Sequence, residues 1–155
     1  MKILVSVLCL LMLVSCGSKY LVKPNSTFLP LNNDEGYLGF VINTLDPLQN
    51  IQLLNKEKNS YFYVGSAQKG TSVVMTKLVE GEYCLVGFDV YNLRVDFTDQ
   101  GFCTYVEAGE LNYFNEYFVR DPVTTSISNY NKFIALIKSS YLNICKEFVN
   151  KECRV

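Results

Sequence analysis

The chain of 155 residues contains no histidine, and this absence limits the chemistry that it can support. Without an imidazole, neither a Ser-His-Asp triad nor a Cys-His pair can form within the chain. The usual protein ligand of zinc and iron is missing as well. Three pairs of carboxylates lie in or beside turns, where charged residues are expected because turns are solvated. These pairs are Glu80 with Glu82, Asp96 with Asp99, and Glu107 with Glu110. We therefore predict no enzymatic activity, no cofactor and no metal site.

Aromatic side chains are the stronger candidates for ligand binding, because their ring faces can stack on a sugar or pack against a partner protein. Half of the side chains in any strand that borders a core must face inward, so only part of each aromatic cluster can reach a ligand. The candidate binding residues are Tyr61, Tyr63, Tyr113 and Tyr117.

The first fifteen residues have the features of an export signal. Lys2 supplies an early positive charge, and the run from Ile3 to Val14 is apolar except for Ser6 and Cys9. Twelve residues are too few for a spanning helix, which needs about 20. We therefore predict that residues 1–15 form a cleaved signal peptide.

The end of this segment, Leu13-Val14-Ser15-Cys16, resembles the lipobox of bacterial lipoproteins. The resemblance implies cleavage before Cys16, lipid on its thiol and further acylation of the new amino terminus, for example with palmitate. Two or more acyl chains hold a protein firmly on a membrane. Gly17 follows the cysteine in place of the aspartate that retains lipoproteins in the inner membrane, which implies the outer membrane, facing the periplasm. The alternative is an ordinary secretory signal that ends in a chance cysteine.

Four cysteines remain once Cys9 leaves with the signal and Cys16 is lipidated. An even number of cysteines in an oxidising compartment predicts disulfides, and four cysteines allow three pairings. We favour Cys84 with Cys103 and Cys145 with Cys153. Free buried thiols are the alternative, whereas a metal site would need short paired spacings such as CxxC, which the sequence lacks.

The mature chain of 140 residues has the size of one domain. It carries 13 basic and 15 acidic residues without a long run of either sign, so we expect no nucleic-acid binding. Residues 16–35 hold two prolines and many Asn, Ser and Thr residues, which predicts a lipidated flexible tether. Residues 36–155 then form the folded domain.

Short segments rich in aromatic and β-branched residues recur between turns, a pattern typical of an antiparallel β-sandwich of seven or eight strands, or of a barrel. The expected strands are 36–45, 51–54, 60–64, 71–78, 83–90, 93–97, 102–107 and 110–119. In the fifth of these, alternation predicts that Cys84, Val86, Phe88 and Val90 face the core.

The period changes in residues 130–149, where apolar side chains recur every three or four positions. This pattern predicts one C-terminal helix that packs against the sandwich. An amphipathic helix lying on the membrane is the alternative. A disulfide between Cys145 and Cys153 would require the helix to end near Asn150, because eight residues of continuous helix span about 12 Å.

Two stretches, Leu78-Val79-Glu80-Gly81-Glu82-Tyr83-Cys84-Leu85-Val86-Gly87-Phe88 and Cys103-Thr104-Tyr105-Val106-Glu107-Ala108-Gly109-Glu110-Leu111-Asn112-Tyr113, resemble a group of uncharacterised bacterial lipoproteins. That group has a prealbumin-like (transthyretin-like, Ig-like) β-sandwich, and the resemblance covers roughly residues 36–119. It implies a fold and an envelope location, but no activity.

These observations predict a membrane-anchored envelope lipoprotein with a non-catalytic β-sandwich that binds another envelope protein or has a structural role. An inhibitor or immunity-type protein is a specific form of this hypothesis. The alternative is a carbohydrate-binding module or an enzyme that acts in the cell envelope.

Overall fold

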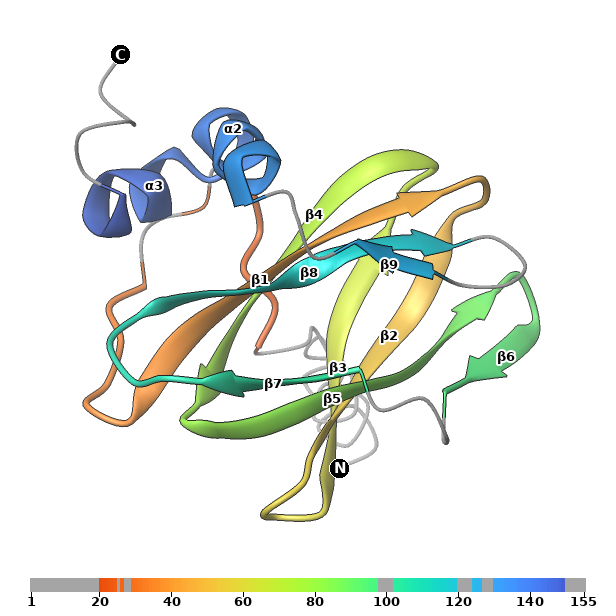
Figure 1. Cartoon of the computed structure of the whole chain (residues 1–155), viewed down its shortest axis with the longest axis horizontal. Helices are drawn as coiled ribbons and strands as arrows, with labels where there is room; N and C mark the ends of the chain where they lie inside the picture. The colour runs from red at the N-terminus through yellow and green to blue at the C-terminus, as the bar shows by residue number, and fades with distance from the viewer. Residues whose placement is uncertain are drawn as a thin grey trace, which may run out of the picture.

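The computed structural model describes residues 20–24, 26, 29–97, 102–119, 124–126 and 130–149 of the chain. This part is mainly β-structure with two short helices near the C-terminus, as Figure 1 shows. The strands are β1 (Glu35–Thr44), β2 (Leu48–Asn55), β3 (Ser60–Ala67), β4 (Gly70–Val79), β5 (Gly81–Val90), β6 (Leu93–Asp96), β7 (Cys103–Val106), β8 (Leu111–Val119) and β9 (Thr124–Ser126). The helices are α2 (Tyr130–Ser140) and α3 (Leu142–Phe148).

The strands form two sheets (Figure 1). Sheet A has the order β4-β1-β8-β9, and sheet B has the order β3-β2-β5-β6, with β7 also paired to β5. All pairs are antiparallel except β1 with β8, so the prediction of a purely antiparallel arrangement was wrong at this position. After β4 the chain leaves sheet A and forms β5, β6 and β7 of sheet B. It then returns to sheet A as β8, which runs beside β1 in the same direction and so gives a parallel pair.

Apolar side chains from both sheets meet in one core. The largest of them are fully buried and include Phe40 on β1, Leu53 on β2, Tyr83 and Phe88 on β5, and Tyr117 on β8. Several of the rings meet edge to face, for example Phe40 and Tyr117 at 6.1 Å between centroids. The mainly β class predicted from the sequence is confirmed.

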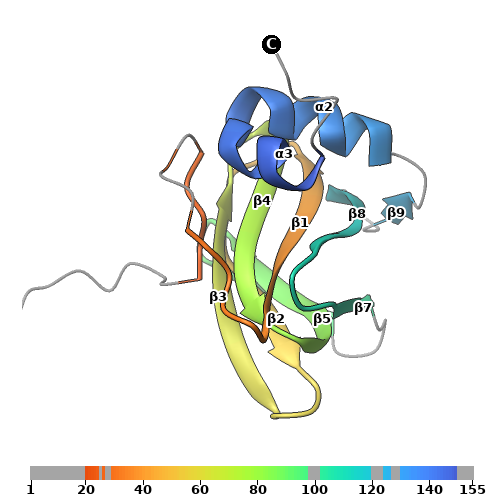
Figure 2. The same cartoon turned by 90° about the vertical axis from the view of Figure 1, so that its left-hand side faces the viewer.

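A second apolar cluster covers the outer face of sheet A. Side chains of α2 and α3, including Phe133, Ile137 and Ile144, pack there against Tyr37 and Met75 of the sheet. Figure 2 shows both helices lying across this face. The prediction that the C-terminal helical segment packs against the β-structure is therefore confirmed.

The predicted single helix is interrupted at Tyr141, where the backbone leaves the helical region (φ −134°, ψ 50°). The hydrogen bonds continue across the break, because the Tyr141 N–H donates to the Ile137 carbonyl (2.8 Å) and the Cys145 N–H to the Tyr141 carbonyl (3.0 Å). The change of direction lets both helices bury apolar side chains in the same cluster. The prediction of one continuous helix was therefore wrong.

Strand β5 contains a bulge that reverses the predicted alternation in its first half. Leu53 pairs with Leu85, but the neighbouring Gln52 pairs with Gly87, so Val86 is an extra residue. Tyr83 and Leu85 consequently point into the core before the bulge. The predicted inward direction of Cys84 and Val86 was wrong, although Cys84 is buried (6% exposed), whereas Phe88 and Val90, which follow the bulge, do pack against the core.

Part of the expected flexible tether belongs to the folded body, because Tyr20 and Val22 pair with β4. The Val22 N–H donates to the Met75 carbonyl, and the Lys77 N–H donates to the Tyr20 carbonyl, both at 3.0 Å. Val22 itself is buried in the cluster beneath the helices. The segment thus adds to the edge of β4, and residues 16–19, with Cys16, lie outside the described residues.

Candidate functional site

The predicted disulfide between Cys84 and Cys103 is confirmed. The two residues pair directly across β5 and β7, with their Cα atoms 3.9 Å apart. Their bond lies on the outer face of sheet B, because the neighbours of Cys84 on the strand, Tyr83 and Leu85, point into the core.

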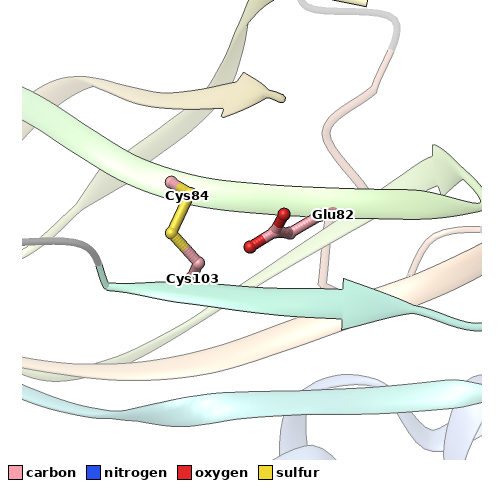
Figure 3. Close-up of side chains that lie close together, drawn as sticks. All are labelled: Glu82, Cys84 and Cys103. Carbon is pink, nitrogen blue, oxygen red and sulfur yellow. A yellow bond between two sulfur atoms is a disulfide. The ribbon is translucent and has the colours of Figure 1, made fainter. Parts of the chain in front are cut away.

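The same region contains a group of side chains with the atom types of a metal site (Figure 3). Ligand atoms of Glu82, Cys84 and Cys103 lie within 4.8 Å of one another. Once the disulfide has formed, however, neither sulfur is a thiolate, which is the form that binds metals. Glu82 also has an ion-pair partner, since the Lys56 ammonium lies 3.3 Å from its carboxylate.

Cys145 is fully buried and is also disulfide-bonded. Its predicted partner, Cys153, lies outside the described residues. The pairing of Cys145 with Cys153 therefore stays a prediction.

The four candidate tyrosines have different surroundings. Tyr61 and Tyr63 on β3 are 59% and 54% exposed, so their rings are accessible to a ligand. Tyr117 is only 1% exposed and lies in the core between the sheets, so its expected binding role was wrong. Tyr113 is half-buried and stacks on Phe133 of α2 at 4.8 Å between centroids. Its ring is therefore part of the packing between helix and sheet rather than a free surface.

Tyr61 and Tyr63 line an open groove of about 970 Å³ on the outer face of sheet B. No described element packs over this groove, in contrast to the helix-covered face of sheet A. Its lining comes from four strands and the N-terminal segment: Tyr20, Leu21, Gln49, Asn50, Gln52, Tyr61, Phe62, Tyr63, Gly65, Ser66, Asp89 and Arg94.

Arg94 organises the polar side of the groove. It lies opposite Asp89 in the β5–β6 ladder, and its guanidinium donates to the carboxylates of Asp89 (3.2 Å) and Asp96 (2.8 Å). It also donates to the Asn50 carbonyl at 3.3 Å and to the side-chain oxygen of Gln52. A guanidinium held by this many acceptors has a fixed orientation.

Asp89 receives a second hydrogen bond, from the Asn50 amide at 2.6 Å. This bond, together with the bond and the charge of Arg94, holds the pKa of Asp89 below its usual range. Asp89 is therefore ionised at neutral pH. The backbone of Asn50 adopts the left-handed conformation (φ 48°), which asparagine tolerates well.

Sequence reasoning identified Tyr61 and Tyr63 but missed Asn50, Gln52 and Arg94. A polar face is already visible in the sequence Leu48-Gln49-Asn50-Ile51-Gln52-Leu53. The strand predicted for residues 51–54 was too short to include Gln49 and Asn50, so this face was not recognised. Nothing in the sequence indicates that Arg94 pairs with this face, because that contact depends on the order of strands in sheet B.

Comparison of the chain with protein-family models, curated proteins and solved structures finds no match. Among the described residues, no helix has both the length and the apolar character needed to cross a membrane.

Proposed function

We propose that the protein is a lipid-anchored, non-catalytic binding module of the bacterial cell envelope, and that it binds its ligand on the outer face of sheet B. The observation that carries this proposal is the difference between the two outer faces. Helices α2 and α3 cover that of sheet A, while that of sheet B carries a groove with two exposed tyrosines and an ordered polar network.

The anchor in this proposal is lipid on Cys16 after removal of residues 1–15, in the outer membrane and facing the periplasm. The pairing of Tyr20 and Val22 with β4 adds a geometric consequence. Cys16 and Tyr20 are four positions apart, and a fully extended chain of that length spans at most about 14 Å. Tyr20 also lines the groove. A lipidated Cys16 would therefore hold the groove close to the bilayer surface.

For the fold, we propose a prealbumin-like β-sandwich of the kind that the sequence resemblance implies. Two sheets that share one core support it. The two helices are then additions to that scheme.

The groove's chemistry supports binding rather than catalysis. A general acid or base works best when its pKa lies near the operating pH. Asp89 is the only carboxylate that lines the groove in the described part of the chain, and its neighbours lower its pKa. It therefore suits an orienting role in which it stays ionised.

A protein is one candidate ligand of this face, including the inhibitor or immunity-type role expected from the sequence. Exposed tyrosine and arginine side chains favour it, because both residue types are enriched in protein interfaces. Such a partner would cover the same face of sheet B.

Two experiments test the proposal. Replacing Cys16→Ala should abolish incorporation of labelled palmitate and release the protein from membranes, and a variant that stays membrane-bound and labelled would contradict the anchor. A photo-crosslinking amino acid at Tyr61 should capture envelope material in living cells, while the same group at Tyr105 should not. Tyr105 is exposed on β7 but does not line the groove. Equal capture at both positions, or none at Tyr61, would contradict the binding face.

A further inference from the structure

We infer that the ligand of the groove on sheet B is an uncharged carbohydrate chain. This inference rests on the proposed function and specifies its ligand class. Three features of the groove support it: its tyrosine platform, its amide groups and its balance of charge.

The platform consists of Tyr61 and Tyr63, which alternate with Phe62 along β3. Residues two apart in a strand lie on the same face, with Cα atoms roughly 6.6 Å apart. Phe62 points the other way and packs edge to face against Tyr20 (5.1 Å) and Tyr83 (5.8 Å). The two exposed rings thus stand side by side on a strand that the core supports. Such rings offer apolar faces on which the C–H groups of successive sugar units can lie.

The amides provide the complementary polar contacts. Asn50 uses its amino group on Asp89, and Gln52 uses its side-chain oxygen on Arg94. No described residue bonds to the remaining acceptor of Asn50 or the remaining donor of Gln52. A sugar hydroxyl both donates and accepts hydrogen bonds, so it matches a site that offers one group of each kind.

The charge of the groove disfavours an acidic ligand. Asp89 and Arg94 are the only charged residues in its described lining, and they pair with each other. Recognition of a phosphate or carboxylate calls for a cation that can form charge-assisted bonds to it. Arg94 already donates to Asp89, Asp96 and Gln52, so it has little capacity left for an anion. An uncharged, hydroxyl-rich ligand fits this arrangement best.

The inference can be tested with the protein purified from membranes in a detergent that contains no sugar. It is applied to an array of uncharged and acidic glycans that includes maltotriose, cellotriose, triacetylchitotriose and trigalacturonic acid, and hits are titrated by calorimetry. We expect an uncharged glycan to bind and the acidic trimer to bind at least about tenfold more weakly. Tyr61→Ala and Tyr63→Ala should each weaken the binding by about tenfold.

Two control variants keep the test specific. Tyr61→Phe retains the ring, and Tyr105→Ala removes an exposed tyrosine of the same sheet outside the groove, so both should bind within roughly twofold of the unmodified protein. Unchanged circular dichroism confirms that the variants fold. Retention of no glycan, a preference for acidic glycans, or binding that ignores Tyr61 and Tyr63 would overturn the inference. A single protein crosslinked at Tyr61 would also overturn it but leave the proposed binding face intact, whereas failure of the crosslink would remove both.

Discussion

Cys84 and Cys103 face each other across β5 and β7, and their disulfide closes the loop that carries β6. Arg94 lies within this loop and holds the polar side of the groove together. The disulfide therefore fixes both ends of the segment that positions Arg94. This relationship links the oxidising environment expected for the protein to the shape of its candidate site.

Loss of this disulfide should lower stability. The bond joins residues separated by 19 positions, and closing a loop of that size contributes about 3 kcal/mol in the chain-entropy model. We expect the double variant Cys84→Ser/Cys103→Ser to lose roughly this free energy of unfolding in urea titrations. Replacing both cysteines avoids a free thiol that could attack the disulfide of Cys145. A change below about 0.5 kcal/mol would contradict a stabilising role.

The hydroxyl of Tyr117 should be dispensable for folding. It is buried without a hydrogen-bond partner among the described residues, and an unpaired buried polar group costs about 1–3 kcal/mol. Tyr117→Phe should therefore raise the free energy of unfolding by about 1 kcal/mol. Tyr83 is the matched control, because its hydroxyl donates to the Val79 carbonyl at 2.9 Å. Tyr83→Phe should lower stability by about 1 kcal/mol, and an equal loss in both variants would contradict this account.

Helix α2 should depend on an ion pair between Lys132, whose side chain is 35% exposed, and a buried carboxylate of sheet A. The Glu116 side chain is only 2% exposed, accepts a hydrogen bond from Asn43 at 2.6 Å and is paired with Lys132 of α2. Lys132→Met would leave a buried carboxylate without its cation, and we expect a loss of about 2 kcal/mol in thermal or urea unfolding. Lys146→Met, at an exposed position on α3, should change stability by less than about 0.5 kcal/mol. Similar losses in both would show that Lys132 has no special role.

The ionisation of Glu35 should make the free energy of unfolding depend on pH. Burial alone raises the pKa of its carboxyl, but the bond and charge of Lys77 and the N–H of Asn32 together lower it below the usual value of 4.5. A lowered folded-state pKa contributes stability that is fully present above pH 4.5 and is lost as the pH falls through the folded-state value. Urea midpoints measured across this acidic range should show this loss.

The Glu35→Gln variant should lack this part of the acid-induced loss, because its side chain does not titrate. Glu110→Gln, at an exposed position before β8, serves as the control and should follow the unmodified protein. If Glu35→Gln and the unmodified protein lose stability in parallel, the linkage to Glu35 is wrong.

Local patterns in the sequence were sufficient to predict eight of the nine described strands, the Cys84–Cys103 pair and the apolar face of the C-terminal helices. These features depend on short-range periodicity and turn residues. The bulge at Val86, the break at Tyr141 and the docking of Tyr20 were not predictable in the same way. Each one depends on contacts with a distant strand or cluster, which override local alternation.

The candidate site also combines features that local patterns predict with features that depend on distant contacts. Alternation along β3 places Tyr61 and Tyr63 on one face, but it does not say whether that face is inside or outside. Tyr113 and Tyr117 illustrate the difficulty, because helix α2 covers one and sheet B covers the other. The polar side of the groove needs the pairing of β5 with β2 and β6, which only the three-dimensional structure provides.

Amide hydrogen exchange of the protein in native membranes tests the central claim, that the outer face of sheet B is the binding surface, most directly. Exchange is compared between the protein in intact envelope vesicles and the same protein after extraction and purification. The account predicts that amides of β2 and β3 around Asn50 and Tyr63 exchange more slowly in the envelope, while those of α2 and α3 exchange equally in both. Extra protection confined to the helices, or no difference anywhere, would contradict it.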